Sequence, residues 1–261
     1  MGRGGKLRDG MQWNMILSEN DRFRAFILSA PTIAENLDID SHFLKRARAE
    51  RCKIVRFWRG GTPPTVVISH GEKVEIAVNE EACRRFGVNI FRRMSGGGAV
   101  LQSDDVLNYS LITPDSGLMD IHRAFGMGMD LVKGILHELG VEGVSQGISD
   151  VAVQNRKISG NSQARKGGGM LVHGTILIDF DYDMAEQVLP HPPREPEYRG
   201  RRKHRDFLVT LKELHAPIDP EHLESACRRA TESVFDAIWL NGDDLSFLSD
   251  GSFVLNGIRH L

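Results

Sequence analysis

The residues with the clearest chemical potential lie in one short stretch, residues 92–100, which read RRMSGGGAV. Three consecutive glycines lack Cβ atoms, so their backbone can approach a ligand closely and turn its N–H groups toward an anion. The two arginines upstream add positive charge and forked hydrogen-bond donors. The stretch therefore predicts an anion or phosphate site, with an ordinary glycine-rich turn as the alternative.

A second stretch, about fifty residues further on, carries a lysine. Residues 149–163 read SDVAVQNRKISGNSQ. Their alternating apolar residues and the Gln154-Asn155 pair predict two short strands joined by a tight turn, with Lys157 on the second strand. Ser159 and Gly160 beside it are small, which leaves room for a ligand. A solvated surface lysine is the alternative.

Two predicted apolar strands carry further polar candidates. Residues 107–113 include Asn108, and residues 170–178 include His173. Asn108 is predicted to donate to a ligand, or alternatively to cap the start of its strand. A structural role is the alternative for His173, and a turn-forming role is the alternative for Asp150.

The combined pattern resembles the lipoate–protein ligases. These belong to the wider superfamily of biotin and lipoate protein ligases and lipoyl or octanoyl transferases. The pattern consists of RRMSGGGAV, LNYS, SDVAVQNRKISGNSQARK and HGTILIDFD, in this order, and the resemblance runs from about Phe23 to about Leu214. Three ordered motifs with compatible spacing, where RRMSGGGAV and LNYS count as one motif, do not arise easily by chance. The resemblance implies the biotin/lipoate-ligase-like catalytic domain.

For activity, the resemblance implies ATP-dependent activation of lipoate, or octanoate, as an acyl adenylate. The acyl group then passes to a lysine of a lipoyl carrier domain, such as an E2 subunit, an H protein or a similar protein. In the ligases the lysine that matches Lys157 contacts both the acid and the nucleotide, so Lys157 is the expected catalytic residue. The implied cofactors are ATP and Mg²⁺, with lipoate as co-substrate.

The residues expected to bind the nucleotide and the acyl group come from all the motifs. Arg93 is expected to pair with phosphate or adenylate oxygens, and the loop after it to form an amide cradle. His173-Gly174-Thr175 would back the acyl slot. No residue is expected to bind a metal ion directly. The whole set is Arg93, Ser95, Gly96, Gly97, Gly98, Ala99, Val100, Leu101, Asn108, Asp150, Lys157, Gly160, His173, Gly174 and Thr175.

Two departures from the family pattern stand out. Many ligases carry Tyr-His-Asp after the alanine-valine pair, whereas this chain has Leu101-Gln102-Ser103, so the histidine's role is lost or moved. Many longer members also have a C-terminal accessory domain that helps adenylate formation. Residues 216–261 are too few for that domain, so we expect a short helical tail and, for the first half-reaction, a separate accessory protein or support from the tail.

Transferases of the same fold are the closest rival. They use a cysteine thioester intermediate and need no ATP. One class has its cysteine shortly before the acidic residue that matches Asp150, and another has it after the segment that matches residues 179–183. Residues 144–149 and 184–193 contain no cysteine, which disfavours a thiol mechanism. We also weigh a cysteine-free amidotransferase, a biotin ligase and a non-catalytic scaffold protein of this fold.

Composition narrows the classes of partner. The 261 residues are 41% hydrophobic and 26% charged, as in ordinary soluble globular proteins, and suffice for one large domain. A formal net charge of −2 gives no general basic field for nucleic acid. No apolar run approaches the ~20 residues of a membrane span. The N-terminal MGRGGKLRDGMQWN lacks a signal-peptide core. We therefore expect a cytoplasmic protein that binds neither nucleic acid nor membrane.

Two further features are open to more than one interpretation. The three cysteines, Cys52, Cys83 and Cys227, are unclustered, so buried structural thiols are expected. The basic run at residues 199–205 could dock an acidic carrier or contact phosphate, with a solvated charged loop as the alternative.

The predicted organisation is an α+β fold with mixed, mostly antiparallel sheets. Residues 1–21 are expected to be a flexible extension, residues 22–215 the catalytic domain and residues 216–261 the tail. A capping box of Thr32 and Glu35 supports the first predicted helix. The predicted strands are 23–28, 53–58, 65–69, 88–91, 107–113 and those around Val151, Ile158 and 170–178. The predicted helices are 32–51, 79–86, 121–140, 208–214 and 221–240, with a loop at 190–197.

Overall fold

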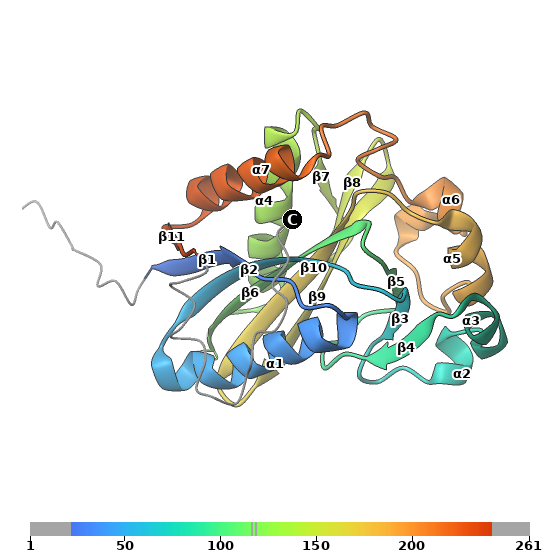
Figure 1. Cartoon of the computed structure of the whole chain (residues 1–261), viewed down its shortest axis with the longest axis horizontal. Coiled ribbons are helices and arrows are strands. Elements are labelled where there is room, and N and C mark those ends of the chain that lie inside the picture. The colour runs from blue at the N-terminus through green and yellow to red at the C-terminus, as the bar shows by residue number, and fades with distance from the viewer. Residues whose placement is uncertain (1–21, 116, 118, 242–261) are drawn as a thin grey trace, which may run out of the picture.

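The structure, a computed structural model, describes residues 22–241 except 116 and 118. The predicted N-terminal extension and residues 242–261 of the predicted tail lie outside the described residues. The described part contains two sheets of different size, with helices packed around both (Figure 1).

An eight-stranded sheet forms the centre, in the order β11-β1-β2-β6-β10-β9-β8-β7. Strand β1 pairs in parallel with β2 and β11, and all the other neighbours are antiparallel. This arrangement confirms the predicted α+β fold with mostly antiparallel strands. The strands are β1 (Phe23–Ile27), β2 (Lys53–Arg59), β6 (Val106–Pro114), β7 (Val144–Gln146), β8 (Asp150–Val153), β9 (Arg156–Lys166), β10 (Gly169–Leu177) and β11 (Ala237–Trp239).

Helices cover both faces of this sheet (Figure 1). Helix α1 (Ile33–Glu50) contacts β6 and β10 on one face, and its predicted capping box of Thr32 and Glu35 is confirmed. Helices α4 (Ile121–Glu138) and α7 (Pro220–Val234) pack together on the other face. Among the residues that the structure describes, no helix has the length and apolar character needed to cross a bilayer.

A three-stranded sheet lies beside the main one, in the order β4-β3-β5. The glycine loop connects β4 to β5, and the amide of Gly96 donates to the carbonyl of Gln163 on β9 at 3.4 Å. The loop therefore lies where the two sheets meet. The remaining elements are β3 (Thr65–Ile68), β4 (Asn89–Arg92), β5 (Val100–Gln102), α2 (Val74–Ala77), α3 (Glu80–Phe86), α5 (Tyr182–Val188), α6 (His204–Phe207) and a 3₁₀ turn, η2 (Glu197–Arg199).

One predicted helix is absent, and another ends earlier than predicted. Residues 208–214 are not helical because their backbone pairs with the sheet: the Val209 amide donates to the Lys157 carbonyl at 2.9 Å, and the Leu211 amide donates to the Leu177 carbonyl at 2.9 Å. The last helix ends at Val234 rather than Leu240, since the following residues form β11 at the sheet edge. The described part of the predicted tail thus consists of helix α7, which packs on α4, and strand β11 at the edge of the central sheet.

Candidate active site

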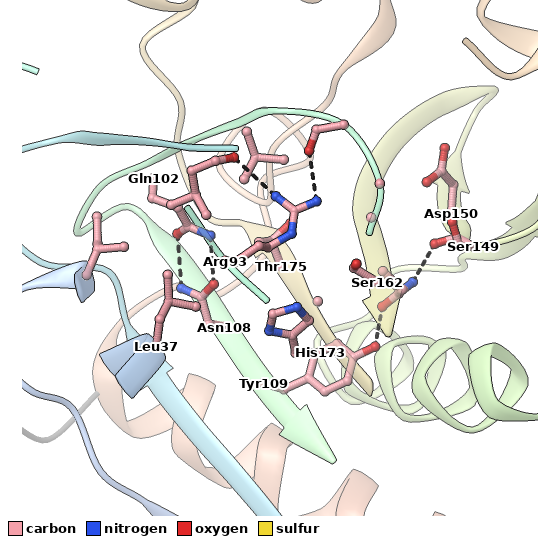
Figure 2. Close-up of a pocket in the computed structure, with 18 of the residues that line it drawn as sticks. Leu37, Arg93, Gln102, Asn108, Tyr109, Ser149, Asp150, Ser162, His173 and Thr175 are labelled. Atoms are coloured by element: carbon pink, nitrogen blue, oxygen red, sulfur yellow. Dashed lines mark hydrogen bonds between the residues drawn. The ribbon is translucent and has the colours of Figure 1, made fainter. Parts of the chain in front are cut away.

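The glycine loop is held from inside by Arg93, which is only 7% exposed. Its guanidinium donates to the Ser95 hydroxyl at 2.9 Å and to the carbonyls of Val67, Gly96 and Gly98 at 3.1, 2.5 and 2.8 Å. Figure 2 shows this side chain beneath the loop. Burial lowers the pKa of Arg93 to about 10, so it stays charged at neutral pH. Arg93 therefore braces the loop, and few of its donors remain for a phosphate.

His173 on β10 lies behind the same loop. Its Nε2 is 2.6 Å from the Ser95 hydroxyl, which already accepts from Arg93. The other ring nitrogen, Nδ1, lies 3.9 Å from a carboxylate oxygen of Asp40. Burial and the nearby Arg93 lower the pKa of His173 to about 3. The ring is thus neutral at neutral pH, is bonded to the loop at Ser95, and also lines the cavity in front of it.

We expect His173→Gln to flatten the acid dependence of stability. Because the folded pKa of about 3 lies below the ordinary 6.5, only the unfolded state takes up a proton as pH falls through this window. Through this group the wild type should lose about 0.7 kcal/mol of unfolding free energy between pH 7 and 6, and about 1.2 kcal/mol between pH 6 and 5. The variant should lack that contribution in urea titrations at pH 7, 6 and 5. His137→Gln, an exposed histidine paired with Glu142, is the control; equal slopes for all three proteins would contradict the assignment.

Lys157 follows a tight turn, as predicted. Gln154 and Asn155 both have positive φ, 50° and 61°, which suits a two-residue hairpin loop. Lys157 Nζ forms an ion pair with Asp150 Oδ1 at 2.8 Å across the hairpin. A Cβ on Gly160 would lie 2.6 Å from that Nζ, so glycine at this position makes room for the lysine.

Three cavities meet at Lys157. The inner one, of about 160 Å³, runs between the sheets to the apolar side chains of Ile33, Leu37, Trp58 and Val67. The widest, of about 530 Å³, opens past Asp150 toward residues 190–197. A smaller apolar one, of about 100 Å³, lies against Ala99 and Leu101. Lys157 and Val100 line all three.

The structure brings nearly all the predicted site residues to these cavities. Ala99 and Leu101 line the smaller one, whereas Ser95 and Gly96 line none of the three. Instead, Ser95 bonds to Arg93 and His173, and the Gly96 carbonyl accepts from Arg93. The predictions of ligand contact are untested by this arrangement and stay predictions. Those lining the inner cavity are Arg93, Gly97, Gly98, Val100, Asn108, Asp150, Lys157, Gly160, His173, Gly174 and Thr175.

Asn108 makes a reciprocal amide pair with Gln102 in the wall of the inner cavity (Figure 2). Gln102 donates to Asn108 at 2.9 Å, and Asn108 donates back at 3.2 Å and to the Val106 carbonyl at 3.2 Å. The donors of Asn108 are thus engaged within the protein. Gln102 is the residue that matches the histidine of many ligases, so in this chain an amide pair stands at the position of that histidine.

Some site residues were not predicted from the sequence. The Tyr109 hydroxyl donates to Asn161, whose amide donates to the Ser149 carbonyl at 2.7 Å, and all three line the inner cavity (Figure 2). From the basic run, Arg199 is only 5% exposed and its guanidinium stacks 4.8 Å from the Phe207 ring. The alternative of a solvated loop is therefore wrong for Arg199. Nothing in a single sequence distinguishes it from its exposed neighbours.

Together, fold and site define a catalytic domain of the lipoylation enzymes. The family of lipoyl protein ligase A/B catalytic domains matches residues 32–232, well over half of the chain. The chain therefore belongs to this family, and the resemblance noted from its motifs is confirmed.

Relatives in the family divide between two activities. Lipoate-protein ligase LplJ of Bacillus subtilis is 30% identical over 179 residues, which cover 69% of this chain and 53% of the ligase. Octanoyltransferase LipM of Geobacillus kaustophilus is 28% identical over 189 residues, 61% of this chain and 66% of the transferase. The chain thus spans about half the length of the first ligase. It is an enzyme of the lipoate and octanoate ligase and transferase family.

Solved structures share the fold. A bi-partite lipoate protein ligase from Thermoplasma acidophilum superimposes with a TM-score of 0.71 at 24% identity, covering 86% of this chain and 89% of that one. A lipoate-protein ligase A bound with ATP gives a TM-score of 0.72 at 22% identity, over 86% and 92% of the two chains. These likenesses confirm the expected catalytic-domain fold.

Proposed function

We propose that the chain is the catalytic domain of an ATP-dependent lipoate–protein ligase. It would activate lipoate, or octanoate, as an acyl-AMP and transfer the acyl group to a lysine of a lipoyl carrier domain. The observation that carries this proposal is the meeting of three cavities at Lys157. A ligase must bring an acid, a nucleotide and an amine to one point, whereas a direct transfer has no nucleotide to place.

The cavities suit the three participants. The inner cavity ends in apolar side chains, as an acyl chain requires, and its carboxyl end would lie near Lys157. The smaller cavity suits a flat aromatic base. A Cβ on Gly98 would meet nothing within 4 Å, so a phosphate can approach the backbone closely there. The acceptor lysine would enter through the widest cavity.

Lys157 would act on the charge of the reaction. Its ammonium would neutralise the carboxylate of the acid and the phosphate oxygens as they approach each other, the stage at which negative charges repel most strongly. Mg²⁺ bound to ATP would add charge to the phosphates, mainly through phosphate oxygens. In the described residues no cluster of three or more His, Cys, Asp or Glu side chains could hold a metal ion.

The absence of a thiol at the site favours the ligase over a cysteine-dependent transferase. All three cysteines of the chain are described and buried, with Cys52 5%, Cys83 2% and Cys227 0% exposed. None of them lines the three cavities, and burial raises the pKa of each thiol. A cysteine-free amidotransferase, which moves acyl groups between carriers without ATP, is the alternative that the octanoyltransferase relatives support.

We also propose that a second polypeptide supports adenylate formation. One finding supports this: the Thermoplasma acidophilum enzyme is described as bi-partite and was studied with its E2 lipoyl domain. Because that enzyme was studied with an E2 lipoyl domain, a lipoyl domain is the acceptor to test first.

The test is the mass shift of an apo lipoyl domain incubated with this protein. Free lipoate is supplied with and without ATP and Mg²⁺, and an octanoyl-carrier donor is run in parallel. We expect modification that needs both ATP and free acid, and Cys83→Ala and Cys227→Ala should retain it. Modification from the carrier donor alone would replace the proposal with the transferase. Silence with both donors would overturn it for this chain acting alone.

A further inference from the structure

Tyr198 forms a chain of contacts with the two charged groups at the junction of the cavities. Its hydroxyl donates to Asp150 Oδ2 at 3.0 Å, and Asp150 Oδ1 pairs with Lys157 Nζ at 2.8 Å. Each oxygen of this buried carboxylate thus has one partner. Burial and Asp150 raise the pKa of Tyr198, against the nearby Arg202 and Arg199, so the phenol remains a neutral donor.

The segment that carries Tyr198, residues 197–209, also holds the backbone of Lys157. Leu208 forms a parallel bridge with Lys157, and the Val209 amide donates to the Lys157 carbonyl at 2.9 Å. This segment therefore fixes the lysine at its backbone directly and at its ammonium through Asp150. The segment includes the basic run at residues 199–205, but none of the residues expected to bind the nucleotide and the acyl group lies in it.

Tyr198 is itself held in place. Its ring lies 5.1 Å from the Phe207 ring, and Phe207 lines both the widest and the smaller cavity. The guanidinium of Arg202 donates to the Tyr198 carbonyl at 2.8 Å and to the carbonyl of Asn155, in the hairpin turn before Lys157, at 2.9 Å. The phenol hydroxyl therefore meets Asp150 in a fixed geometry.

We propose that Tyr198 is a positioning residue that sets how firmly Asp150 holds Lys157. This inference rests on the proposed function, in which Lys157 turns toward the acid and the phosphate. A carboxylate that accepts an O–H bond on one oxygen shares its charge, and so attracts the ammonium on its other oxygen less strongly. Without the phenol, the ion pair between Asp150 and Lys157 would be stronger. The lysine would then leave Asp150 to contact the acid and the phosphate less often.

Tyr198→Phe tests the proposal because it removes only the hydroxyl. We expect kcat for lipoylation to fall about tenfold, the effect of one hydrogen bond to a charged group. The KM for lipoate should change little, since the phenol does not line the inner cavity. Tyr182→Phe is the matched control. Tyr182 also donates to a carboxylate, Glu213 at 2.7 Å, and lines none of the three cavities.

A second readout does not depend on activity. Lys157 is partly exposed, with 26% of its side chain accessible, so a water-soluble N-hydroxysuccinimide acetate can reach it. Peptide mass spectrometry then gives the acetylation rate of this one lysine at pH 8. We expect Tyr198→Phe to slow acetylation of Lys157 about threefold and Tyr182→Phe to leave it unchanged.

The two readouts separate the two proposals. If the wild type lipoylates no acceptor but the Tyr198→Phe labelling rate falls, the proposed function fails and the positioning role stands. If the wild type is active while Tyr198→Phe matches Tyr182→Phe in both kcat and labelling, the positioning role is overturned. The positioning role would also be overturned if both tyrosine variants lost kcat and thermal stability to the same extent.

Discussion

Lys157→Ala is expected to abolish detectable acyl transfer, a fall of about 10² to 10³-fold or more. The reason is its place at the junction of the three cavities, where no second lysine of the described chain lines the walls. The fold should survive, because the side chain makes one ion pair, with Asp150, at a partly exposed position. The buried Asp150 carboxylate also keeps its second donor, the Tyr198 hydroxyl at 3.0 Å, when the lysine is removed. The measurement is the mass-shift assay, with circular dichroism and thermal unfolding on the same preparations.

Lys212→Ala provides the control for this prediction. Lys212 also pairs with an aspartate, Asp179 at 2.5 Å, but its side chain is 63% exposed and it lines none of the three cavities. The two variants therefore lose the same type of ion pair. Transfer should persist in Lys212→Ala at the wild-type rate. Retained transfer in Lys157→Ala would remove the lysine from the proposed mechanism and with it the main support for adenylate chemistry.

Most of the fold followed from local sequence patterns. The capping box at Thr32, the apolar stripe of residues 121–140 and the turn at Gln154-Asn155 all involve neighbours in the sequence, and the structure confirms each. The helix prediction for residues 208–214 failed because their apolar spacing suits a helix, whereas their amides bond to carbonyls of β9 and β10 far away in the sequence. The prediction missed strand β11 for the same reason, because its pairing partner, β1, lies more than 200 residues earlier.

The site followed from the sequence only where a motif carried it. Lys157, Asp150 and the glycine loop belong to recognisable stretches, and the structure brings them together. The contact of Arg93 with phosphate stays a prediction, whereas its bonds to the carbonyls of its own loop could not be predicted, because they depend on the backbone conformation and not on residue type. Tyr198 could not be identified, since its contact with Asp150 joins residues 48 positions apart.

Arg56→Met is expected to lower the free energy of unfolding by about 3–5 kcal/mol, because it leaves a buried carboxylate without its cation. Arg56 and Asp40 are 0% and 1% exposed and lie 2.7 Å apart. Arg56 also donates to the carbonyls of Leu28 and Asn36 at 2.9 and 2.8 Å, which ties β2 to α1. Urea unfolding at pH 7 measures the loss.

Two comparisons separate buried charge from lost packing. Arg22→Met breaks an exposed pair with Asp236 at the same 2.7 Å and should cost about 1 kcal/mol or less. The double variant Arg56→Met with Asp40→Asn removes both charges and should be more stable than Arg56→Met alone. A double variant less stable than the single one would show that the pair acts through packing and not through charge.

The buried pair also bears on the site. The second oxygen of Asp40 accepts the Ser110 hydroxyl at 2.6 Å and faces His173 Nδ1 at 3.9 Å, and His173 in turn fixes Ser95 of the glycine loop. Arg56→Met should therefore loosen the loop as well as the helix. At a temperature where the variant is still folded, we expect the KM for ATP to rise more than the KM for the lipoyl domain. Equal changes in both would confine the pair to a role in stability.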